Sequence, residues 1–343
     1  MADTNILLRC KITKLAETIM PLVLADVPVI IYGKTGIGKS SVIRHEVTPA
    51  LGKILGLEAI LHDYRLSTKD IVDGTGMPVT NLAKMRTDWT CPAFIPEDDG
   101  KLHVIFWDEA GHANVQLQHL LYGAVNDREM GGYRFPVHNR MILATNMRED
   151  QGGDNKFLRP LCNRSAHVIA ESDPQGFIEN LKRWGWDSRL IAFYSLRPDQ
   201  IHCESDTSAA FPTERTGELF NKVLKKLPVD APKTAIENAA HAICGEGFSR
   251  QFMTFLNNLA AGLPKIADIL ASPSKAKVPT DPHYQYVVAS GVSKHLNIQN
   301  AVRFAEYLER LMPDVRSMAA HDAMTRDPAL RNVPELKALV LGS

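Results

Sequence analysis

The chain has 343 residues, of which 45% are hydrophobic and 23% are charged, and its 39 Lys and Arg residues are balanced by 39 Asp and Glu residues. This length is enough for two or three domains with hydrophobic cores of their own. Because the net charge is zero, the chain as a whole does not attract nucleic acid or an anionic membrane, although a local basic patch remains compatible with these totals. Nucleic acid is therefore a possible partner but not the favoured one.

The cysteines and the apolar segments bear on the compartment. Five cysteines are scattered without a C-x-x-C pair, which argues against a disulfide framework and favours a reducing compartment. The most apolar early stretch, residues 19–32, contains two prolines and Asp26, so it fits neither a membrane span nor a signal segment. We expect a cytoplasmic protein without a membrane span.

Five short β-rich runs alternate with helical patterns in the first half of the chain. They are residues 29–32, 59–64, 102–107, 141–144 and 166–170. Such alternation predicts an α/β fold with a five-stranded parallel sheet that has helices on both faces. Because open sheets of this kind bind ligands at the carboxyl ends of their strands, we expect the functional residues at that edge.

The second half of the chain is expected to be helical. Strand signals stop after Glu171, and the remaining helical patterns are interrupted by Pro and Gly. We expect a core domain over residues 1–171, a smaller helical lid domain over 172–264 and a helical extension over 265–343. Residues 271–282 are rich in Pro, Ser and Lys and predict an exposed loop or linker.

Residues 33–40 read GKTGIGKS, between an apolar run and a helix-compatible segment. The pattern G-x-x-x-x-G-K-[ST] is typical of a P-loop, whose glycines let the turn aim backbone amides at phosphate oxygens. Lys39 would reach the β- and γ-phosphates of a nucleoside triphosphate, and Ser40 would hold Mg²⁺. An ordinary Gly-rich turn is the alternative, but the strand before and the helix after favour the P-loop. The predicted nucleotide-binding residues here are Gly33, Lys34, Thr35, Gly36, Ile37, Gly38, Lys39, Ser40 and Ser41.

Two adjacent carboxylates, Asp108 and Glu109, follow the apolar run 102–107. Downstream of a P-loop, this arrangement is typical of a Walker B motif. Asp108 would bind the Mg²⁺ held by Ser40, directly or through water, and Glu109 would polarise the water that attacks the γ-phosphate. By itself, an Asp-Glu pair after a strand is usually a solvated turn.

Asn146 follows the apolar run 141–144, with one residue between them, in the way that Asp108 follows the apolar run 102–107. Its amide could fix the attacking water, whereas the alternative is a helix cap or turn former. No Asn-Lys-x-Asp motif, which recognises guanine, follows a predicted strand. Residues 155–158 match only the Asn and Lys of that motif. We therefore expect ATP rather than GTP.

Three arginines are candidates for contacts with the phosphates. Arg164 and, as second choice, Arg159 precede the last predicted strand, and either could be an arginine finger that stabilises transition-state charge. Arg215 lies at the start of an amphipathic helical pattern in the predicted lid and could report the loss of phosphate. The alternative for Arg164 and Arg159 is a surface or salt-bridged arginine, and Arg215 could equally be a charge on the helix surface.

The motifs GKTGIGKS, VIFWDEAG and LATN, the arginine before the last strand and PTERT together resemble those of AAA+ ATPases. Their order and spacing are similar to the MoxR-like, dynein- and midasin-related branch, over residues 28–170 and the Arg215 region. Residues 70–96 resemble that branch's insert, and residues 127–140 resemble its β-hairpin, with Gly131 and Gly132 at the turn. MoxR-like proteins commonly read DEINRA after the Walker B strand, where this chain has His112 in place of the arginine.

The resemblance implies a homo-oligomeric ring, usually a hexamer, in which the arginine of one subunit completes its neighbour's site. It implies that Mg²⁺ and ATP are the cofactors, that Asn146 is the sensor 1 residue, and that the protein has a chaperone-like role. In that role, hydrolysis would remodel a separate partner, often one with a von Willebrand factor A domain. Two alternatives remain: a nucleotide-dependent assembly switch or scaffold, and the motor subunit of a nucleic-acid-processing system. The insert and the hairpin would project toward the ring axis or a partner.

Overall fold

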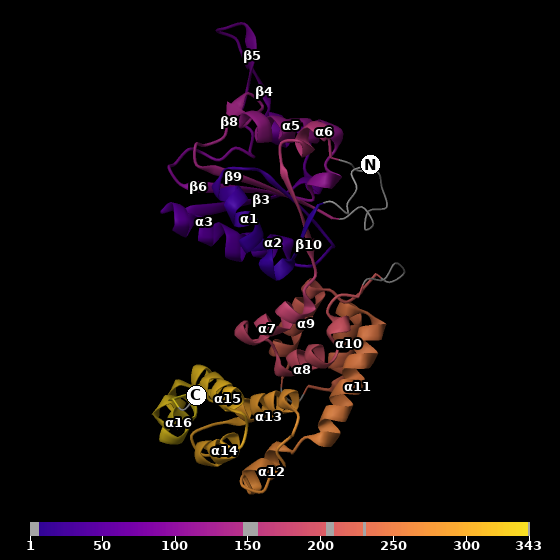
Figure 1. Cartoon of the computed structure of the whole chain (residues 1–343), viewed down its shortest axis with the longest axis vertical. Coiled ribbons are helices and arrows are strands. Elements are labelled where there is room, and N and C mark those ends of the chain that lie inside the picture. Colours follow the sequence, from indigo (N-terminus) through magenta and orange to yellow (C-terminus); the bar gives the residue numbers. More distant parts are fainter. Residues whose placement is uncertain (1–6, 147–156, 204–208, 229–230, 342–343) are drawn as a thin grey trace. The chain divides into compact units, whose positions relative to one another are not determined.

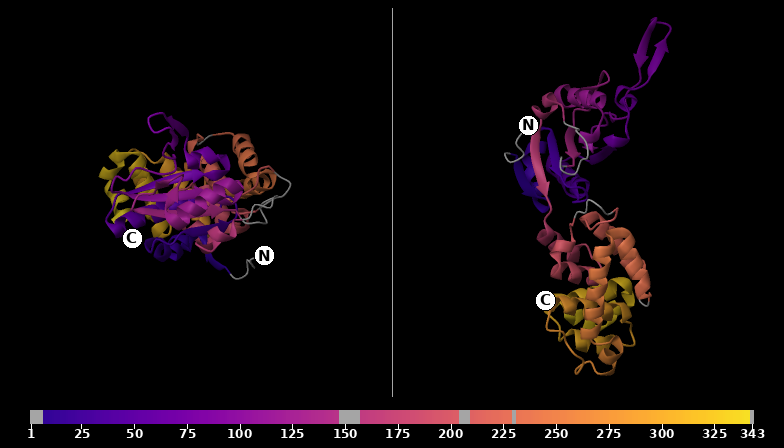
Figure 2. Two further views of the ribbon diagram at one scale, coloured as in Figure 1. Left: turned by 90° about the horizontal axis from the view of Figure 1, so that it is seen from above. Right: turned by 90° about the vertical axis from the view of Figure 1, so that its right-hand side faces the viewer.

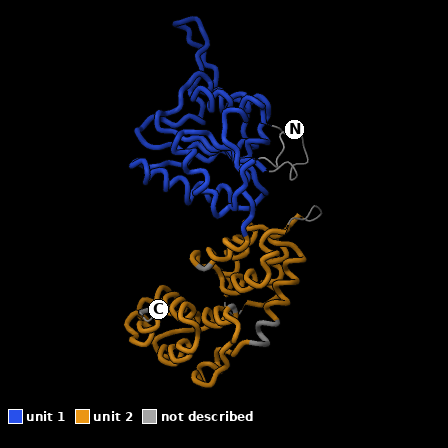
Figure 3. The backbone as a smooth tube through the Cα atoms, in the orientation of Figure 1, with its two compact units in different colours: residues 1–173 blue, residues 174–343 orange. Residues whose placement is uncertain are grey.

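The computed structural model describes residues 7–146, 157–203, 209–228 and 231–341 (Figure 1). The chain divides into two compact units, Met1–Asp173 and Pro174–Ser343 (Figure 3). Among the described residues, no helix combines the length and the hydropathy that a membrane crossing requires.

The first unit is built on a parallel sheet of six strands. The strands are β1 (Leu8–Lys11), β2 (Val29–Gly33), β3 (Ala59–Arg65), β6 (Leu102–Asp108), β9 (Asn139–Thr145) and β10 (Ala166–Glu171). Their order is β1-β10-β2-β9-β6-β3, and every neighbouring pair is parallel. The predicted α/β class with a helical second half is therefore confirmed.

The predicted number of five strands is wrong, because β1 adds a sixth at the edge. Residues Leu8 to Lys11 pair with Val168 to Glu171. The sequence gives little warning of this strand, since it has only four residues and none of them is buried. Backbone pairing with β10, rather than an apolar run, places it in the sheet.

Helices cover both faces of the sheet (Figure 2). The helices of this unit are α1 (Leu15–Leu24), α2 (Lys39–Val42), α3 (Thr48–Leu55), α4 (Ile71–Thr75), α5 (Val115–Asp127) and α6 (Arg159–Cys162), with a π-helical turn η3 (Ile43–Val47) and 3₁₀ turns η2 (Ile12–Lys14), η4 (Leu66–Thr68) and η5 (Ala110–His112). Alternate residues of β6 point to opposite faces, so that Val104 and Phe106 pack with α1 and α3, and Trp107 packs with α5. Burial on both faces explains why the strand reads as a continuous apolar run.

Two β-hairpins lie outside the main sheet. The segment expected as an insert holds α4 and an antiparallel hairpin of β4 (Pro78–Asn81) and β5 (Arg86–Trp89), which projects from the first unit (Figures 1 and 2). At its tip, Leu82 is 77% exposed and Met85 is 87% exposed. These apolar side chains have no cover within the described part of the chain.

The second hairpin is the one predicted between residues 127 and 140. It consists of β7 (Glu129–Met130) and β8 (Tyr133–Arg134), and its turn residues Gly131 and Gly132 have φ angles of 59° and 83°. Two positive φ angles in a two-residue turn are what a type I′ hairpin requires. The Tyr133 hydroxyl donates a hydrogen bond to the carbonyl oxygen of Trp89, which joins this hairpin to the projecting one.

The second unit is helical throughout its described residues. Its helices are α7 (Pro174–Arg183), α8 (Ser188–Leu196), α9 (Glu214–Lys226), α10 (Lys233–Cys244), α11 (Glu246–Gly262), α12 (Ile266–Ala271), α13 (Pro282–His295), α14 (Ala301–Leu308), α15 (Pro313–Arg326) and α16 (Pro334–Leu341), with 3₁₀ turns η7 (Pro198–Gln200) and η8 (Pro328–Asn332). They form two hydrophobic clusters, one centred on α8, α9 and α11 and the other on α13 to α16. The predicted division of this half into lid and extension near residue 264 stays a prediction.

The segment between α12 and α13 is an irregular loop, as its composition predicts, but it is not a loose linker. Ala276 is buried within the C-terminal cluster. The Tyr307 hydroxyl donates to the carbonyl oxygen of Lys277 at 2.8 Å, and Gln285 Nε2 donates to that of Pro279 at 2.9 Å. These contacts attach the loop to the helices that follow it.

Candidate active site

The predicted P-loop lies between the end of β2 and the start of α2. Gly36 and Gly38 have φ angles of 82° and 99°, which side chains of L residues rarely adopt. At Gly38 an added Cβ would meet no atom within 4 Å, so the loop leaves open space beside the start of α2. The glycine spacing therefore gives the turn that the sequence predicts.

Lys39 begins α2 and is almost fully buried, with 7% of its surface exposed. Its Nζ donates to the carbonyl oxygens of Gly33 at 2.6 Å and Lys34 at 2.9 Å, and to Asn146 Oδ1 at 3.2 Å. A buried ammonium group needs acceptors on several sides, and these three supply them. The contact with Asn146 joins the P-loop to the end of β9.

Ser40 and Asp108 meet across the site. Ser40 Oγ donates to Asp108 Oδ2 at 2.9 Å, and the backbone N–H of Glu109 donates to Asp108 Oδ1 at 2.9 Å. Asp108 is 9% exposed, and β6 delivers it to the same sheet edge as the P-loop. The two residues predicted to hold Mg²⁺ are therefore neighbours, although 68 positions separate them in the chain.

Glu109 lies in the left-handed region, with φ of 56° and ψ of 31°. This conformation is uncommon for a residue with a side chain and is often found at functional sites. Its carboxylate accepts a hydrogen bond from Ser67 Oγ and lies 3.6 Å from Arg65 Nε. The carboxylate is thus held by residues from the end of β3 and from η4.

Ser67 and Arg65 are the site residues that sequence reasoning missed. They follow the predicted strand 59–64, just as Asp108 and Asn146 follow theirs. The rule that ligands bind at the carboxyl ends of parallel strands could have found them. Neither belongs to a recognisable motif, which is why motif reading alone passed over them.

Asn146 reaches the P-loop because β9 lies directly beside β2, with Tyr32 in register with Thr145. The segment after Glu109 packs closely against the same strand end: a Cβ built on Gly111 would lie 2.3 Å from Thr145 Oγ1. Glycine at this position therefore lets the Walker B segment approach the strand that carries Asn146.

Arg164 and Arg159 are both exposed on the first unit. Arg164 contacts α5 and α6: its Nε donates to Asn126 Oδ1, its Nη1 donates to the carbonyl oxygen of Pro160 at 3.2 Å, and its guanidinium lies 4.8 Å from the Tyr122 ring centre. None of these contacts involves Lys39 or its partners. The structure therefore does not bring Arg164 together with the P-loop of its own subunit.

Arg215 belongs to the second unit. It is the second residue of α9, whose start is capped by Thr213, and its side chain is exposed. The preceding residue, Glu214, is buried, and its Oε2 is hydrogen-bonded to His202 Nδ1 at 2.7 Å. A role for Arg215 at the phosphates stays a prediction.

His112 ends η5 beyond the Walker B strand. Its backbone N–H donates to the carbonyl oxygen of Glu109 at 2.9 Å, and its buried Nδ1 has no hydrogen-bond partner in the described structure. Within the described residues, no group of three or more His, Cys, Asp and Glu side chains could hold a metal ion. His112 is thus not brought into a metal cluster there.

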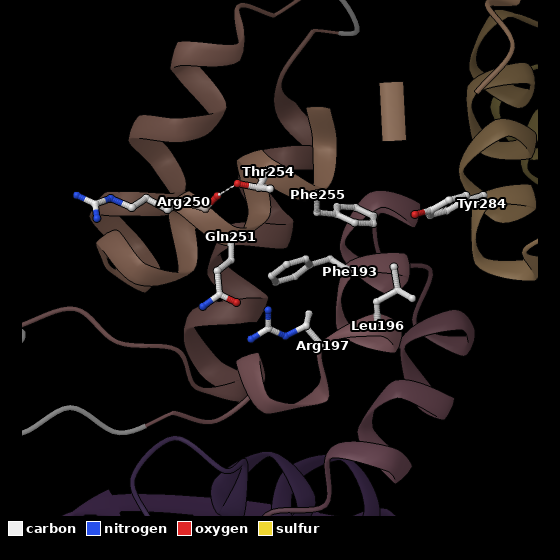
Figure 4. A pocket seen from close by; sticks show the side chains of 8 residues that line it. All are labelled: Phe193, Leu196, Arg197, Arg250, Gln251, Thr254, Phe255 and Tyr284. Atoms are coloured by element: carbon white, nitrogen blue, oxygen red, sulfur yellow. Dashed lines mark hydrogen bonds between the residues drawn. The ribbon is translucent and has the colours of Figure 1, made fainter. Parts of the chain in front are cut away.

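A separate cavity of about 380 Å³ lies in the second unit (Figure 4). It is lined by Phe193, Leu196, Arg197, Arg250, Gln251, Thr254, Phe255 and Tyr284. Arg197 and Arg250 are already paired with the carboxylates of Asp199 and Glu246, respectively. No predicted site residue lines this cavity, and we assign it no role.

The residues at the first unit's sheet edge fit a magnesium nucleotide. Mg²⁺ typically takes one or two protein oxygens and completes its shell with phosphates and water, and two adjacent ligands at about 2.1 Å lie about 3.0 Å apart. The 2.9 Å between Ser40 Oγ and Asp108 Oδ2 is close to that separation. Lys39 Nζ, which now satisfies backbone carbonyl oxygens, could exchange them for phosphate oxygens.

Comparisons with known proteins show a similarity in fold to solved structures. No family model matches the chain, and no curated protein matches it. Among solved structures, it is similar to the RuvB Holliday junction branch migration motor of Thermotoga maritima, with 18% identity, a TM-score of 0.40, and coverage of 73% of this chain and 77% of that chain. It is also similar to NtrX from Brucella abortus in complex with ADP, with 15% identity, a TM-score of 0.40, and coverage of 96% of this chain and 68% of that chain. At such identities, the function has to be argued from the site.

Proposed function

We propose that this protein is a Mg²⁺-dependent ATPase of the AAA+ class, in its MoxR-like branch, which uses hydrolysis to remodel a partner protein. The observation that carries the proposal is the meeting of Lys39, Ser40 and Asp108 with Asn146 at one sheet edge. Three separate segments supply these side chains, and each arrives with the chemistry that its motif predicts. An ordinary Gly-rich turn would not require such convergence.

The residues divide the chemical work between them. Bound Mg²⁺-ATP supplies the phosphoanhydride bond that is broken. Lys39 would bind the β- and γ-phosphate oxygens, while Ser40 and Asp108 would hold the metal ion. Glu109 would accept the proton of the attacking water, and Asn146 would orient that water through its amide.

Glu109 has to change partners for this role. In the structure its carboxylate is bound to Ser67 and lies near Arg65. A general base must be within hydrogen-bond reach of the proton it takes, and catalytic contacts of this kind often form only in the substrate complex. We infer that Glu109 leaves Ser67 when nucleotide and water are in place.

Assembly into a ring, which we take to be a hexamer, would complete the site. Arg164 rests on α5 and α6 rather than on its own P-loop. A guanidinium supplied by a neighbouring subunit stabilises charge on the transferring phosphoryl group and can raise the rate about 10³- to 10⁵-fold. Arg159 is the second candidate for this role, and Arg215 would act from the lid.

The two hairpins are the parts through which we expect hydrolysis to act on a partner. The projecting hairpin exposes Leu82 and Met85, and it is joined to the second hairpin by the bond from Tyr133 to Trp89. Exposed apolar side chains on a projecting element are typical of protein contacts. The partner would be a separate protein, for which a von Willebrand factor A domain is the candidate from the family resemblance.

The test is ATP hydrolysis by the purified full-length chain with Mg²⁺. Wild-type protein should release phosphate, and Lys39→Ala should weaken ATP binding by about 10- to 150-fold, because hydrogen bonds to charged phosphate are lost. Glu109→Gln should bind ATP and hardly hydrolyse it, and it should retain partners during purification with ATP. If neither ATP binding nor phosphate release is found, the proposal is wrong; if Glu109→Gln assembles normally but retains no partner, an assembly switch is favoured. Stimulation of hydrolysis by DNA or RNA would instead favour a nucleic-acid motor.

A further inference from the structure

The guanidinium of Arg164 is held on three sides by its own subunit. Tyr122 and Asn126 lie one turn apart on α5, so their side chains share one face of that helix. The Tyr122 ring packs against the guanidinium with 4.8 Å between the ring centre and Cζ, and Asn126 Oδ1 accepts a hydrogen bond from Nε. On the third side, Nη1 donates to the carbonyl oxygen of Pro160 at 3.2 Å.

The amide of Asn126 is itself oriented. Its Nδ2 donates to Asp127 Oδ1 at 2.6 Å, which fixes its Oδ1 as the acceptor for Arg164. In the described residues, Nη2 of Arg164 makes no hydrogen bond. One edge of the guanidinium is therefore held while another is left for a further acceptor.

The backbone that carries Arg164 is also fixed. The N–H of Arg164 donates to the carbonyl oxygen of Leu161 at 3.2 Å, and the Leu161 side chain is fully buried in the core beneath α5. Arg159, the other candidate, begins α6 with an exposed side chain that makes no hydrogen bond or ion pair in the described structure. Of the two arginines, only Arg164 is held in a defined direction.

We propose that Tyr122 and Asn126 are positioning residues, which hold Arg164 in the orientation that completes the ATP site of the adjacent subunit. This inference rests on the proposed function and adds to it which residues hold the arginine. A free arginine side chain loses conformational entropy when it is fixed at a site. Because Tyr122 and Asn126 already restrict the Arg164 side chain within its own subunit, part of this entropy is lost before the neighbour's phosphate is contacted. Contact with the phosphate then costs less free energy, as in preorganised sites generally.

The proposal predicts effects on turnover rather than on nucleotide affinity. Tyr122→Ala and Asn126→Ala should each lower kcat about three- to tenfold, which is the range expected for losing one cation–π contact or one hydrogen bond. Binding of the fluorescent ATP analogue mant-ATP should stay within about twofold of wild type, because neither residue touches its own P-loop. Tyr122→Phe keeps the ring and should restore most of the lost rate. The matched control is Gln116→Ala, an exposed position on another face of α5.

Mixing subunits separates a role in the neighbour's site from damage to the subunit itself. Tyr122→Ala has an intact P-loop and a misplaced arginine, whereas Lys39→Ala has a placed arginine and a P-loop that binds nucleotide only weakly. Rings assembled from both should be more active per Tyr122→Ala subunit than Tyr122→Ala alone, because some of its sites now face a correctly held Arg164.

The outcomes can be told apart. If wild type hydrolyses ATP and Arg164→Ala is inactive but both α5 variants turn over at the wild-type rate, positioning is refuted and the proposed function stands. If Tyr122→Ala is slow and mixing restores nothing, Tyr122 acts within its own subunit and the inference is again refuted. If wild type itself neither binds nor hydrolyses ATP, the proposed function has failed instead.

Discussion

The Ser67 hydroxyl donates a hydrogen bond to the carboxylate of Glu109, so that the predicted catalytic base is bound by a residue of the 3₁₀ turn η4, which follows the neighbouring β3 strand. Sequence separates the two by 42 positions, and parallel pairing of β3 with β6 brings them together. In the proposed reaction, Glu109 would leave this bond to reach the attacking water.

Ser67→Ala should raise ATP hydrolysis in the absence of a partner. Removal of one hydrogen bond worth about 0.5–1.5 kcal/mol favours the orientation of Glu109 toward water, which corresponds to about a two- to tenfold increase in rate. Phosphate release measured on the full-length protein tests this, with Ser67→Thr as the control because it keeps the hydroxyl. A rate that falls would show that Ser67 supports catalysis rather than restrains it.

Gly111→Ala should impair the site by a steric clash. The new Cβ would lie 2.3 Å from Thr145 Oγ1 and 3.2 Å from Thr145 Cβ, so the segment after Glu109 must move away from the strand that carries Asn146. Misplacement of about 1 Å can cost about 10²-fold in rate, and a fall of at least tenfold in kcat is expected. Gly247→Ala is the control, since its Cβ meets no atom within 4 Å. Equal activity of both variants would contradict the close packing.

Gly131→Ala should push the turn of the second hairpin away from α4, the helix that precedes the projecting hairpin. At this position a Cβ would lie 3.0 Å from the carbonyl oxygens of Gly74 and Thr75, in a backbone with φ of 59°. We expect ATP binding to be retained and partner capture, measured in the Glu109→Gln background, to fall. Gly132→Ala separates the two causes, because it has a positive φ of 83° but no atom within 4 Å. If both variants capture partner equally, backbone strain rather than the clash with α4 explains any effect.

Asp187 makes the stability of the second unit depend on pH in the acid range. Burial by itself would raise the pKa of this carboxyl, but hydrogen bonds from Arg189 and the charge of Lys294 lower the pKa below its ordinary value of 3.8. Because the pKa of Asp187 is lower in the native than in the unfolded state, the ionised carboxylate stabilises the native state fully above the unfolded-state pKa. This stabilisation is lost as the pH falls from there through the native-state pKa. The wild-type free energy of unfolding should therefore decrease through this acid range.

Asp187→Asn tests this dependence because asparagine can still cap α8 but carries no charge. The variant should lose about 1–2 kcal/mol of stability at pH 7, less than for a fully buried pair because Arg189 and Lys294 are partly exposed. Urea unfolding followed by circular dichroism should show the difference at pH 7 and a smaller one near pH 3. A difference that does not change with pH would exclude the charge of Asp187 as its cause.

The sequence by itself determines the local parts of this protein. The turn from Gly33 to Ser40, the apolar strands and the carboxylates at the end of β6 depend on residues that are close along the chain, through glycine φ angles and buried apolar runs. The Gly131-Gly132 hairpin turn is predictable for the same reason. These features could be predicted with correct positions because their physical causes are short-ranged.

Tertiary structure alone decides which distant segments meet. The bonds from Lys39 to Asn146 and from Ser67 to Glu109 depend on the order of strands in the sheet, and β1 joins that sheet through backbone hydrogen bonds that leave no pattern in its side chains. The contacts of Tyr122 and Asn126 with Arg164 likewise require α5 and α6 to pack together. Such contacts arise between residues far apart in sequence, and their geometry follows from packing that no local pattern encodes.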